Sequence, residues 1–249
     1  MRKIFILFFL SLYSFNVKAQ ISIDSFNFTD KSHLFSYKKL IVPATLITYG
    51  TLSLFSENLI KVDLNIKNYS QSQIATHTKI DNYLQFVPAI GVYALNVAGL
   101  KGKHDFKDRT IIFLSSQIIT SSLVLPLKYI SHQQRPNQTN FFSFPSGHTA
   151  MAFSGAHFFF REYREKNVFL AISAYPIAMA VGGLRISNNK HWFSNVAAGA
   201  GIGILSTELA YWAFPAINKH LKFSKHNIQA IILPVIGAQQ FGVSCLAWF

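Results

Sequence analysis

Apolar runs separated by short polar segments recur along this chain of 249 residues. Most runs approach the roughly 20 residues that an α-helix needs to cross the hydrocarbon core of a bilayer. Because only helices and closed barrels satisfy every backbone hydrogen bond in lipid, the pattern predicts an all-α fold, an integral membrane bundle of about six helices. The runs are residues 40–55, 83–100, 110–127, 149–160, 168–184 and 196–214.

Residues near the edges of these runs indicate where helices start and how they pack. Asp and Asn side chains accept hydrogen bonds from the free amides of a first helical turn, so such a residue at the edge of a run predicts an N-cap. The predicted caps are Asp81, Asp108, Asn167 and Asn195. Small residues allow two helices to approach closely, and the last run contains Gly199, Gly201 and Gly203.

The two ends of the chain differ from its apolar core. Arg2 and Lys3 precede an apolar run from Ile4 to about Leu12, and Val17, Lys18 and Ala19 follow, which is typical of a secretory signal cleaved after Ala19; the alternative is an uncleaved anchor. Near the other end, apolar residues alternate from Phe241 to Phe249, which is compatible with a short C-terminal β-hairpin. The predicted divisions are a signal peptide at 1–19, a polar N-terminal segment at 20–39, a membrane core at 40–215 and a basic linker with an apolar tail at 216–249.

The charge balance narrows the classes of partner. Lys and Arg number 23 against 10 Asp and Glu, a formal net charge of +13. The positive residues lie in short loops between apolar runs rather than along an aromatic-studded surface, so the expected partner is the membrane with its anionic headgroups, not nucleic acid. The single cysteine, Cys245, excludes an internal disulfide and a thiolate metal cluster. No obligatory protein partner is evident.

The orientation of the bundle follows from where the basic residues lie. By the positive-inside rule the basic segments face the cytoplasm, whereas a cleaved signal followed by six full crossings would place them outside. The two agree if the first run, interrupted by Pro43, is only half inserted. The chain is then predicted in a bacterial inner membrane, with the loops at 128–147 and 185–195 on the periplasmic face. The basic segments are 31–39, 101–109, 161–166 and 219–225.

The loops after the third and fifth runs lie on one side whatever the orientation, and they hold an unusual polar set. Lys128, Arg135 and Arg185 are three cations without a carboxylate close by in those loops, a combination that suits a dianionic tetrahedral ligand such as phosphate. Ser146 and Gly147 stand at a predicted helix start, whose free amides favour the same anion. The set is completed by His148, His191 and Asn195.

Three motifs in these loops have a familiar order and spacing. "KYISHQQRP" at 128–136 reads K-x6-R-P, "PSGH" occupies 145–148, and "RISNNKHWFSN" at 185–195 reads R-x5-H-x3-N. Together they resemble the type 2 phosphatidic acid phosphatase family, whose signature is K-x6-R-P, P-S-G-H and S-R-x5-H-x3-D. The resemblance covers about residues 83–214 and implies a membrane enzyme that hydrolyses a phosphorylated lipid.

The resemblance also implies a role for each matching position. His191 would be the nucleophile that attacks phosphorus to give a phosphohistidine, and His148 would be the general acid that protonates the leaving oxygen. This scheme needs no metal and no other cofactor. The residues expected to bind the phosphate oxygens are Lys128, Arg135, Ser146, Gly147 and Arg185.

Two positions depart from the family pattern. Leu184 replaces a serine, and Asn195 replaces the aspartate that is expected to accept a hydrogen bond from the ring of His191. In serine-protease triads the same Asp-to-Asn replacement costs about 10⁴ in rate. The resemblance therefore implies a weakened enzyme, while Asn195 also suits an N-cap of the last helix.

The predicted function is a metal-independent lipid phosphate phosphatase of the cell envelope. Substrates of the right class are lipid A, undecaprenyl pyrophosphate and phosphatidic acid. The alternative is a non-catalytic lipid-phosphate-binding membrane protein derived from such an enzyme, which Asn195 motivates. The related vanadium haloperoxidases share the anion site, but the lipid-length runs argue against their soluble scaffold.

Overall fold

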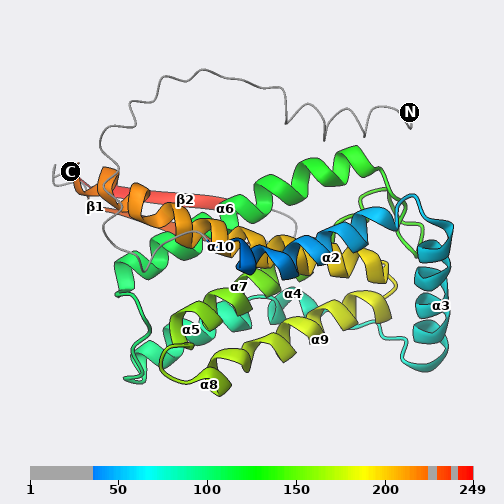
Figure 1. The fold of residues 1–249 in the computed structure, drawn as a ribbon, viewed down its shortest axis with the longest axis horizontal. Helices are drawn as coiled ribbons and strands as arrows, with labels where there is room; N and C mark the ends of the chain where they lie inside the picture. The colour runs from blue at the N-terminus through cyan, green and yellow to red at the C-terminus, as the bar shows by residue number, and fades with distance from the viewer. Residues whose placement is uncertain (1–35, 224–228, 237–240, 249) are drawn as a thin grey trace. The chain divides into compact units, whose positions relative to one another are not determined.

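The computed structural model describes residues 36–223, 229–236 and 241–248. The predicted signal peptide at 1–19 and nearly all of the polar segment at 20–39 lie outside the described residues. From residue 36 to 223 the chain is built of helices (Figure 1), as the apolar runs predict.

Each predicted run contains a helix, although the helix bounds differ from those of the runs. The second run is divided between α4 and α5 and the fifth between α8 and α9, while α3 lies where no apolar run was found. The elements are η2 (Tyr37–Leu40), α2 (Ile41–Leu52), α3 (Glu57–Gln73), α4 (Asp81–Leu84), α5 (Val87–Val97), α6 (Phe106–Ser131), α7 (Gly147–Tyr163), α8 (Val168–Ile172), α9 (Ala174–Ser187) and α10 (Phe193–Phe223).

Fewer helices qualify as membrane spans than the six that the apolar runs predict. Among the described residues, α6 and the segment Val168–Ser187, which comprises α8 and α9, are long and apolar enough to cross a bilayer. The pair Tyr37–Leu52 and Glu57–Gln73 passes the same test when taken together, but it is bent by 94°. By length and composition, the described chain therefore has two such helices, or three if the bent pair counts as one span.

Helix α3 is the element that the hydropathy pattern misses. It carries Asn, Gln, Lys and Ser along much of its length, so no apolar run marks it. Its inward positions include the buried Asp63, whose Oδ1 accepts a hydrogen bond from the backbone N–H of Ser194 at 2.9 Å. A polar interaction thus holds α3 against the first turn of α10.

The predicted helix caps are only partly correct. Asn167 caps α8, because its Oδ1 accepts from the N–H of Leu170 at 3.0 Å. Helix α6 is instead capped by Asp105, whose Oδ1 accepts from the N–H of Asp108 at 2.8 Å, so Asp108 lies inside the first turn. Asp81 and Asn195 likewise lie inside the first turns of α4 and α10, and both make other contacts, described below.

Helix α7 lies at the centre of the bundle, and most of its residues are buried. Its aromatic side chains Phe158 and Tyr163 have no exposed surface and pack in the main apolar core. Helix α10 crosses α7 at very short range: a Cβ added to Gly199 would stand 2.5 Å from the carbonyl oxygen of Ser146, and one added to Gly203 would collide with the carbonyl of Ala150. The glycines of the last run therefore serve the close helix contact that the sequence predicts.

Beyond α10 the structure describes two strands, β1 (Gln229–Ile236) and β2 (Phe241–Trp248). They pair antiparallel, with Gln229 opposite Trp248 and Ile236 opposite Phe241. This pairing includes the alternating segment from Phe241 onward, whose pattern is compatible with a hairpin.

Candidate active site

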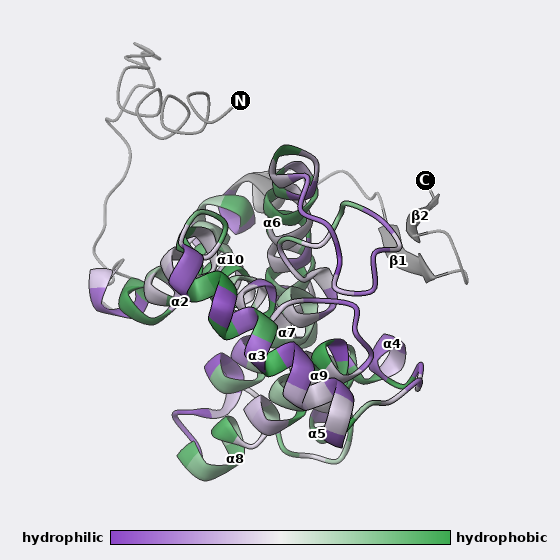
Figure 2. Ribbon diagram, turned by 90° about the vertical axis from the view of Figure 1, so that its right-hand side faces the viewer, coloured by the Kyte–Doolittle hydropathy of each residue, from purple (hydrophilic) through white to green (hydrophobic). Residues whose placement is uncertain are grey.

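The residues of the three motifs meet at one end of the helical bundle. The C-terminal ends of α6 and α9 lie at the same end as α3 and the start of α10 (Figure 1). Seen from that end, hydrophilic residues colour much of the connecting loops (Figure 2). Lys128 lies in the last turn of α6 and Arg185 in the last turn of α9, while Ser146 is the N-cap of α7.

Lys128 anchors the loop between α6 and α7. Its Nζ donates to the carbonyl oxygens of Phe142 at 3.0 Å and Pro145 at 2.7 Å. The loop is thereby folded back over the end of α6, which brings the start of α7 beside the ammonium group. This contact explains why a lysine in the last turn of α6 and a motif 17 residues later belong to one site.

The two arginines present buried guanidinium edges without partners. Within the described chain, Nε of Arg135 and Nε of Arg185 are buried and donate to no hydrogen-bond partner. An unpaired buried N–H costs on the order of 1–3 kcal/mol, more when the group is charged. Burial and the neighbouring Arg185 also lower the pKa of Arg135. An anion with several oxygens would satisfy both edges at once.

Arg185 is not free at its other edge. Its terminal NH1 forms an ion pair of 2.5 Å with Oδ2 of Asp81, whose side chain is almost completely buried. The expectation that no carboxylate lies near the cations is therefore wrong. The loops themselves lack one, but α4 brings Asp81 to the end of α9 from a part of the chain outside the motifs.

His191 is buried and oriented by a backbone carbonyl. Its Nδ1 lies 2.8 Å from the carbonyl oxygen of Ser143, which can only accept, so Nδ1 carries the proton and Nε2 carries the lone pair. Burial and the positive charges of Arg185, Lys128 and Arg135 lower the pKa of His191 well below its ordinary value. The ring is therefore neutral at pH 7, with a nucleophilic nitrogen free.

Asn195 does not bond to His191, which corrects the expectation taken from the family pattern. Its Oδ1 accepts from the hydroxyl of Ser143 at 2.6 Å and from the N–H of Trp192 at 3.3 Å, and its Nδ2 donates to Oε1 of Gln133 at 2.8 Å. The Asn195 side chain therefore serves as acceptor for Ser143 and Trp192 and as donor to Gln133. Asn195 thus holds Ser143, and the carbonyl of Ser143 in turn holds His191.

His148 occupies the first turn of α7, outside both candidate spans. Its Nε2 lies 2.8 Å from Oδ1 of Asn82. Burial and the charge of Arg185 lower the pKa of His148 to about 4, with smaller effects of the same sign from Arg135 and Lys128. In the absence of an anion, His148 is therefore neutral at pH 7.

Ser146 and Gly147 form the start of α7 as the sequence predicts. The hydroxyl of Ser146 is buried and lies 2.9 Å from the hydroxyl of Thr149. Its backbone N–H donates to the carbonyl of Asn195 at 3.0 Å, which ties the starts of α7 and α10 together. At Gly147 an added Cβ would meet Val124 at 3.7 Å and Cε of Lys128 at 3.9 Å, so Gly147 lies directly above the lysine stem.

Three residues of the site were missed by sequence reasoning. Asp81 and Asn82 lie in "KIDNYL", where a polar pair before an apolar run indicates only a helix start. Ser143 acts through its carbonyl oxygen, which every residue type possesses. None of the three belongs to a recognisable sequence motif. Only the fold brings them next to the motif residues.

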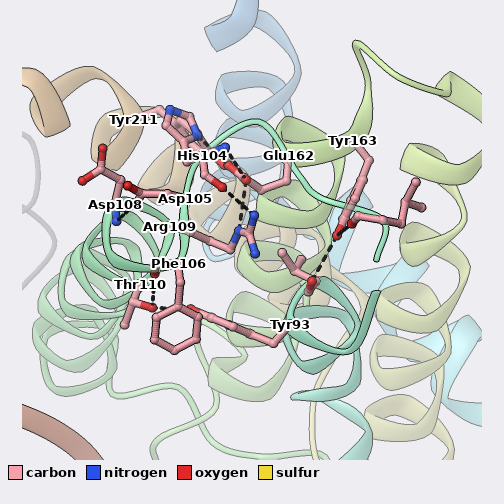
Figure 3. Close-up of polar contacts among 12 residues, drawn as sticks. Tyr93, His104, Asp105, Phe106, Asp108, Arg109, Thr110, Glu162, Tyr163 and Tyr211 are labelled. Atoms are coloured by element: carbon pink, nitrogen blue, oxygen red, sulfur yellow. Dashed lines mark hydrogen bonds and ion pairs between the residues drawn. The ribbon is translucent and has the colours of Figure 1, made fainter. Parts of the chain in front are cut away.

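A second buried polar cluster lies at the other end of α7 and has a different character (Figure 3). Glu162 accepts from Nε of Arg109 at 3.2 Å and from the hydroxyl of Tyr211 at 2.7 Å, and it lies 2.7 Å from Nδ1 of His104. A carboxylate already paired in this way cross-links α6, α7 and α10 rather than binding an anion. No group of His, Cys, Asp or Glu able to hold a metal occurs among the described residues.

Comparisons with known proteins agree with the motifs. Residues 109–219 match the model of the PAP2 superfamily. The lipid A 1-phosphatase of Porphyromonas gingivalis is 31% identical over 224 residues, which cover 85% of this chain and 50% of that protein. This chain therefore spans about half the length of that relative.

Two solved structures are also similar. The crystal structure of LpxE from Aquifex aeolicus shares 22% identity with a TM-score of 0.45, and the match covers 59% of this chain and 93% of that one. A transmembrane PAP2-type phosphatidylglycerolphosphate phosphatase from Bacillus subtilis shares 18% identity with a TM-score of 0.49, over 76% of this chain and 100% of that one.

Proposed function

Since residues 109–219 belong to the PAP2 superfamily of membrane phosphatases, we propose that this chain hydrolyses a phosphorylated lipid through a phosphohistidine at His191. One observation carries the proposal. A neutral, oriented imidazole lies among three cations, two of which have buried guanidinium edges without partners in the described chain. This arrangement combines a nucleophile with a binding site for the anion that it would attack.

The bound phosphate would be held by the three cations. Arg135 and Arg185 would each donate from the unpaired Nε edge, and Lys128 would supply a point charge. The hydroxyl of Ser146 and the amide of Gly147 at the start of α7 would contact the same oxygens. Because these groups are fixed before the substrate arrives, they stabilise charge that shifts during phosphoryl transfer without reorganising.

The reaction would proceed in two displacements. Nε2 of His191 attacks phosphorus as the bond to the leaving oxygen breaks, and that oxygen takes a proton from His148. Water then attacks the phosphohistidine, gives a proton to His148 and releases inorganic phosphate and His191. The cations would stabilise both transition states, and the proton that water gives to His148 would leave with the phosphate product.

The proton on His148 has to arrive with the substrate. Without an anion the pKa of His148 is about 4, so the ring is almost entirely neutral at pH 7. A phosphate monoester monoanion carries one proton, since its second pKa is about 6. On binding, the phosphate charge would offset the surrounding cations and raise the pKa of His148, which allows the proton to pass to the ring.

Lipid A carrying a 1-phosphate is the substrate that we propose to test first. The support is the similarity to the P. gingivalis lipid A 1-phosphatase and the position of the site at helix ends, which would let acyl chains remain in lipid. Undecaprenyl pyrophosphate and phosphatidic acid are the next candidates. We also propose that the site faces the periplasm of a bacterial inner membrane.

Phosphate release by purified protein in detergent tests the function. We expect the wild-type protein to release phosphate from at least one of these three lipids, and His191→Ala to abolish release. The control is His132→Asn, because His132 lies in the same loop, is exposed and adopts a left-handed conformation (φ 44°) that Asn tolerates. The control should retain wild-type activity.

The alternative, a lipid-phosphate binder without turnover, is decided by the same samples. It would be favoured if the wild-type protein binds inorganic phosphate but releases none from any lipid, and if Asn195→Asp does not restore release. Turnover that depends on His191 would exclude it.

A further inference from the structure

We propose that α4 positions the two groups on which the chemistry depends: Asp81 orients Arg185, and Asn82 orients His148. The inference rests on the proposed function, because it concerns the same site. Asp81 and Asn82 are consecutive, each contacts one motif residue, and both lie outside the segment 109–219 that matches the superfamily model.

The contact of Asp81 fixes which edge of Arg185 remains available. Oδ2 of Asp81 pairs with the terminal NH1 at 2.5 Å, while Nε of the same guanidinium is buried without a partner. Oδ1 of Asp81 accepts from Nδ2 of Asn188 at 3.4 Å, so both carboxylate oxygens are engaged. The planar guanidinium is thus held from one side, and its free edge has one orientation.

The contact of Asn82 fixes the tautomer of His148. Oδ1 of Asn82 accepts from Nε2 of the ring at 2.8 Å, which leaves the lone pair on Nδ1. Asn82 is exposed, so this bond lies at the solvent-facing edge of the proposed site. A ring held by one nitrogen presents the other nitrogen in a defined direction, which proton transfer requires.

Helix α4 is too short to hold this position alone, and the preceding segment fastens it to the end of α9. The N–H of Thr76 donates to the carbonyl of Ser187 at 3.2 Å, and its hydroxyl donates to Oδ1 of Asn188 at 2.9 Å. Nδ2 of Asn188 donates in turn to the carbonyl of Thr78 at 3.0 Å. The turn after Arg185 and the turn before Asp81 therefore form one unit.

The charge of Asp81 also acts on His148. The groups that influence His148 are Arg185, Arg135 and Lys128, which lower its pKa, and Asp81, which raises it. His191 is the other titratable ring beside this group. Removing the charge of Asp81 would leave the cations uncompensated and hold His148 neutral over a wider pH range.

The first experiment follows His148 by ¹⁵N NMR of histidine-labelled protein in detergent, which requires no turnover. In the wild-type protein, Nε2 should carry the proton; in Asn82→Ala the two tautomers should mix. In Asn82→Asp, which restores an acceptor and adds a charge, the pKa of His148 should rise by about one unit or more. The same Ala substitution should lower kcat about tenfold, and it should add nothing in a His148→Ala background.

The second experiment separates orientation from binding at Asp81. We expect Asp81→Asn to lower kcat by about 10- to 100-fold, as for partners that orient metal ligands. Inorganic phosphate should bind as tightly as before or more tightly, because the site loses a negative charge. A merely structural role would instead lower binding and kcat together, in proportion to the loss of folded protein.

The matched control is Tyr83→Ala, the next residue of α4, whose side chain is 76% exposed. It should leave kcat, phosphate binding and the His148 signals unchanged. Unaltered His148 signals and kcat in Asn82→Ala, or parallel losses of binding and kcat in Asp81→Asn, would overturn the inference. If the wild-type protein shows the NMR behaviour but no turnover, α4 has the positioning role and the proposed function fails.

Discussion

At the scale of single residues, the proposed nucleophile, His191, is held by a neutral group rather than by a carboxylate. The carbonyl of Ser143 orients His191, and Asn195 supports Ser143 from behind. A carbonyl fixes the tautomer as an aspartate would, but it adds no negative charge to stabilise an imidazolium. Attack through Nε2 also makes the ring cationic, because Nδ1 keeps its proton, but the negative oxygens of the transferred phosphoryl group then lie next to that charge.

This arrangement predicts a small effect for the substitution that the family pattern suggests. Asn195→Asp should change kcat by no more than about threefold, far from the factor of about 10⁴ that the corresponding exchange produces in serine-protease triads. The reason is that position 195 contacts Ser143, Trp192 and Gln133 instead of the ring. Initial rates on the best lipid substrate measure the effect, and a gain of a hundredfold would show that an aspartate reaches His191.

The pH dependence follows from the two imidazoles. The pKa of His191 is lowered, so the proposed nucleophile stays neutral, and therefore able to attack, to well below pH 6.5. The pKa of His148 is about 4 in the unliganded site, so the proton enters with the monoanionic substrate. We expect kcat/KM to fall about tenfold per pH unit above the second pKa of the substrate phosphate, near pH 6.

Measuring kcat/KM against pH with two lipid phosphates of different second pKa tests whether the substrate phosphate causes this fall. The pH at which kcat/KM begins to fall should shift with the second pKa of the substrate. A fall that begins at one pH for both substrates would assign it to a group on the protein.

At the scale of elements, the contact between α7 and α10 decides how tightly the site can close. Gly199 of α10 lies against the carbonyl of Ser146, and Gly203 lies one turn further along against Ala150. The starts of the two helices are also joined through Ser146 and Asn195. A change in the distance between these helices is therefore transmitted to the first turn of α7, where His148 lies.

Gly203→Ala and Gly183→Ala form a matched pair that tests this contact. At Gly203 the new methyl group would collide with the backbone of α7, and overpacking of this kind costs about 1–3 kcal/mol. At Gly183 nothing lies within 4 Å, so Ala should be neutral or stabilise α9 by up to about 1 kcal/mol. Thermal unfolding in detergent should show a Tm several degrees lower for Gly203→Ala only. Equal Tm values would mean that α7 and α10 are not in close contact.

How well the sequence predicts a helix depends on how apolar that helix is. Apolar runs located α2 and α5 to α10, because burial and lipid both require apolar side chains. Helix α3 was missed, and α4 was not distinguished from the start of the second run, because polar contacts such as Asp63 with Ser194 and Asp81 with Arg185 hold these helices in place. Such contacts join residues more than 100 positions apart, so no local pattern reveals them.

The candidate site divides in the same way. The motifs supplied the residues expected to touch phosphate, from Lys128 to His191, since these types and spacings are tied to the chemistry. The partners that orient them come from elsewhere or act through the backbone, as Asn82 and Ser143 do. Asp81 was interpreted as a helix cap, because an Asp before an apolar run is usually one.

At the scale of the whole described chain, the two ends of the bundle differ in how their buried charged groups are paired. Around Lys128 and Arg185, cations outnumber carboxylates and leave hydrogen-bonding edges unpaired. At the other end, Glu162 and Glu208 are each paired with cations, including Arg109 and Arg161, although NH1 of Arg109 is also buried without a partner. The anion site that we propose is the one around Lys128 and Arg185, so this end has to face the compartment where the lipid phosphate is presented.

Labelling of single cysteines tests which compartment that is. The two ends lie on opposite sides of α7, whose 17 residues span about 25 Å at 1.5 Å per residue. We choose Thr139→Cys in the exposed loop beside the site and Lys166→Cys in the exposed turn after α7, both in a Cys245→Ser background. With a membrane-impermeant maleimide, Thr139→Cys should react in intact spheroplasts, and Lys166→Cys only after lysis. The reverse pattern would place the site on the cytoplasmic face, and the first substrates to test would then be lipids whose phosphate is exposed there.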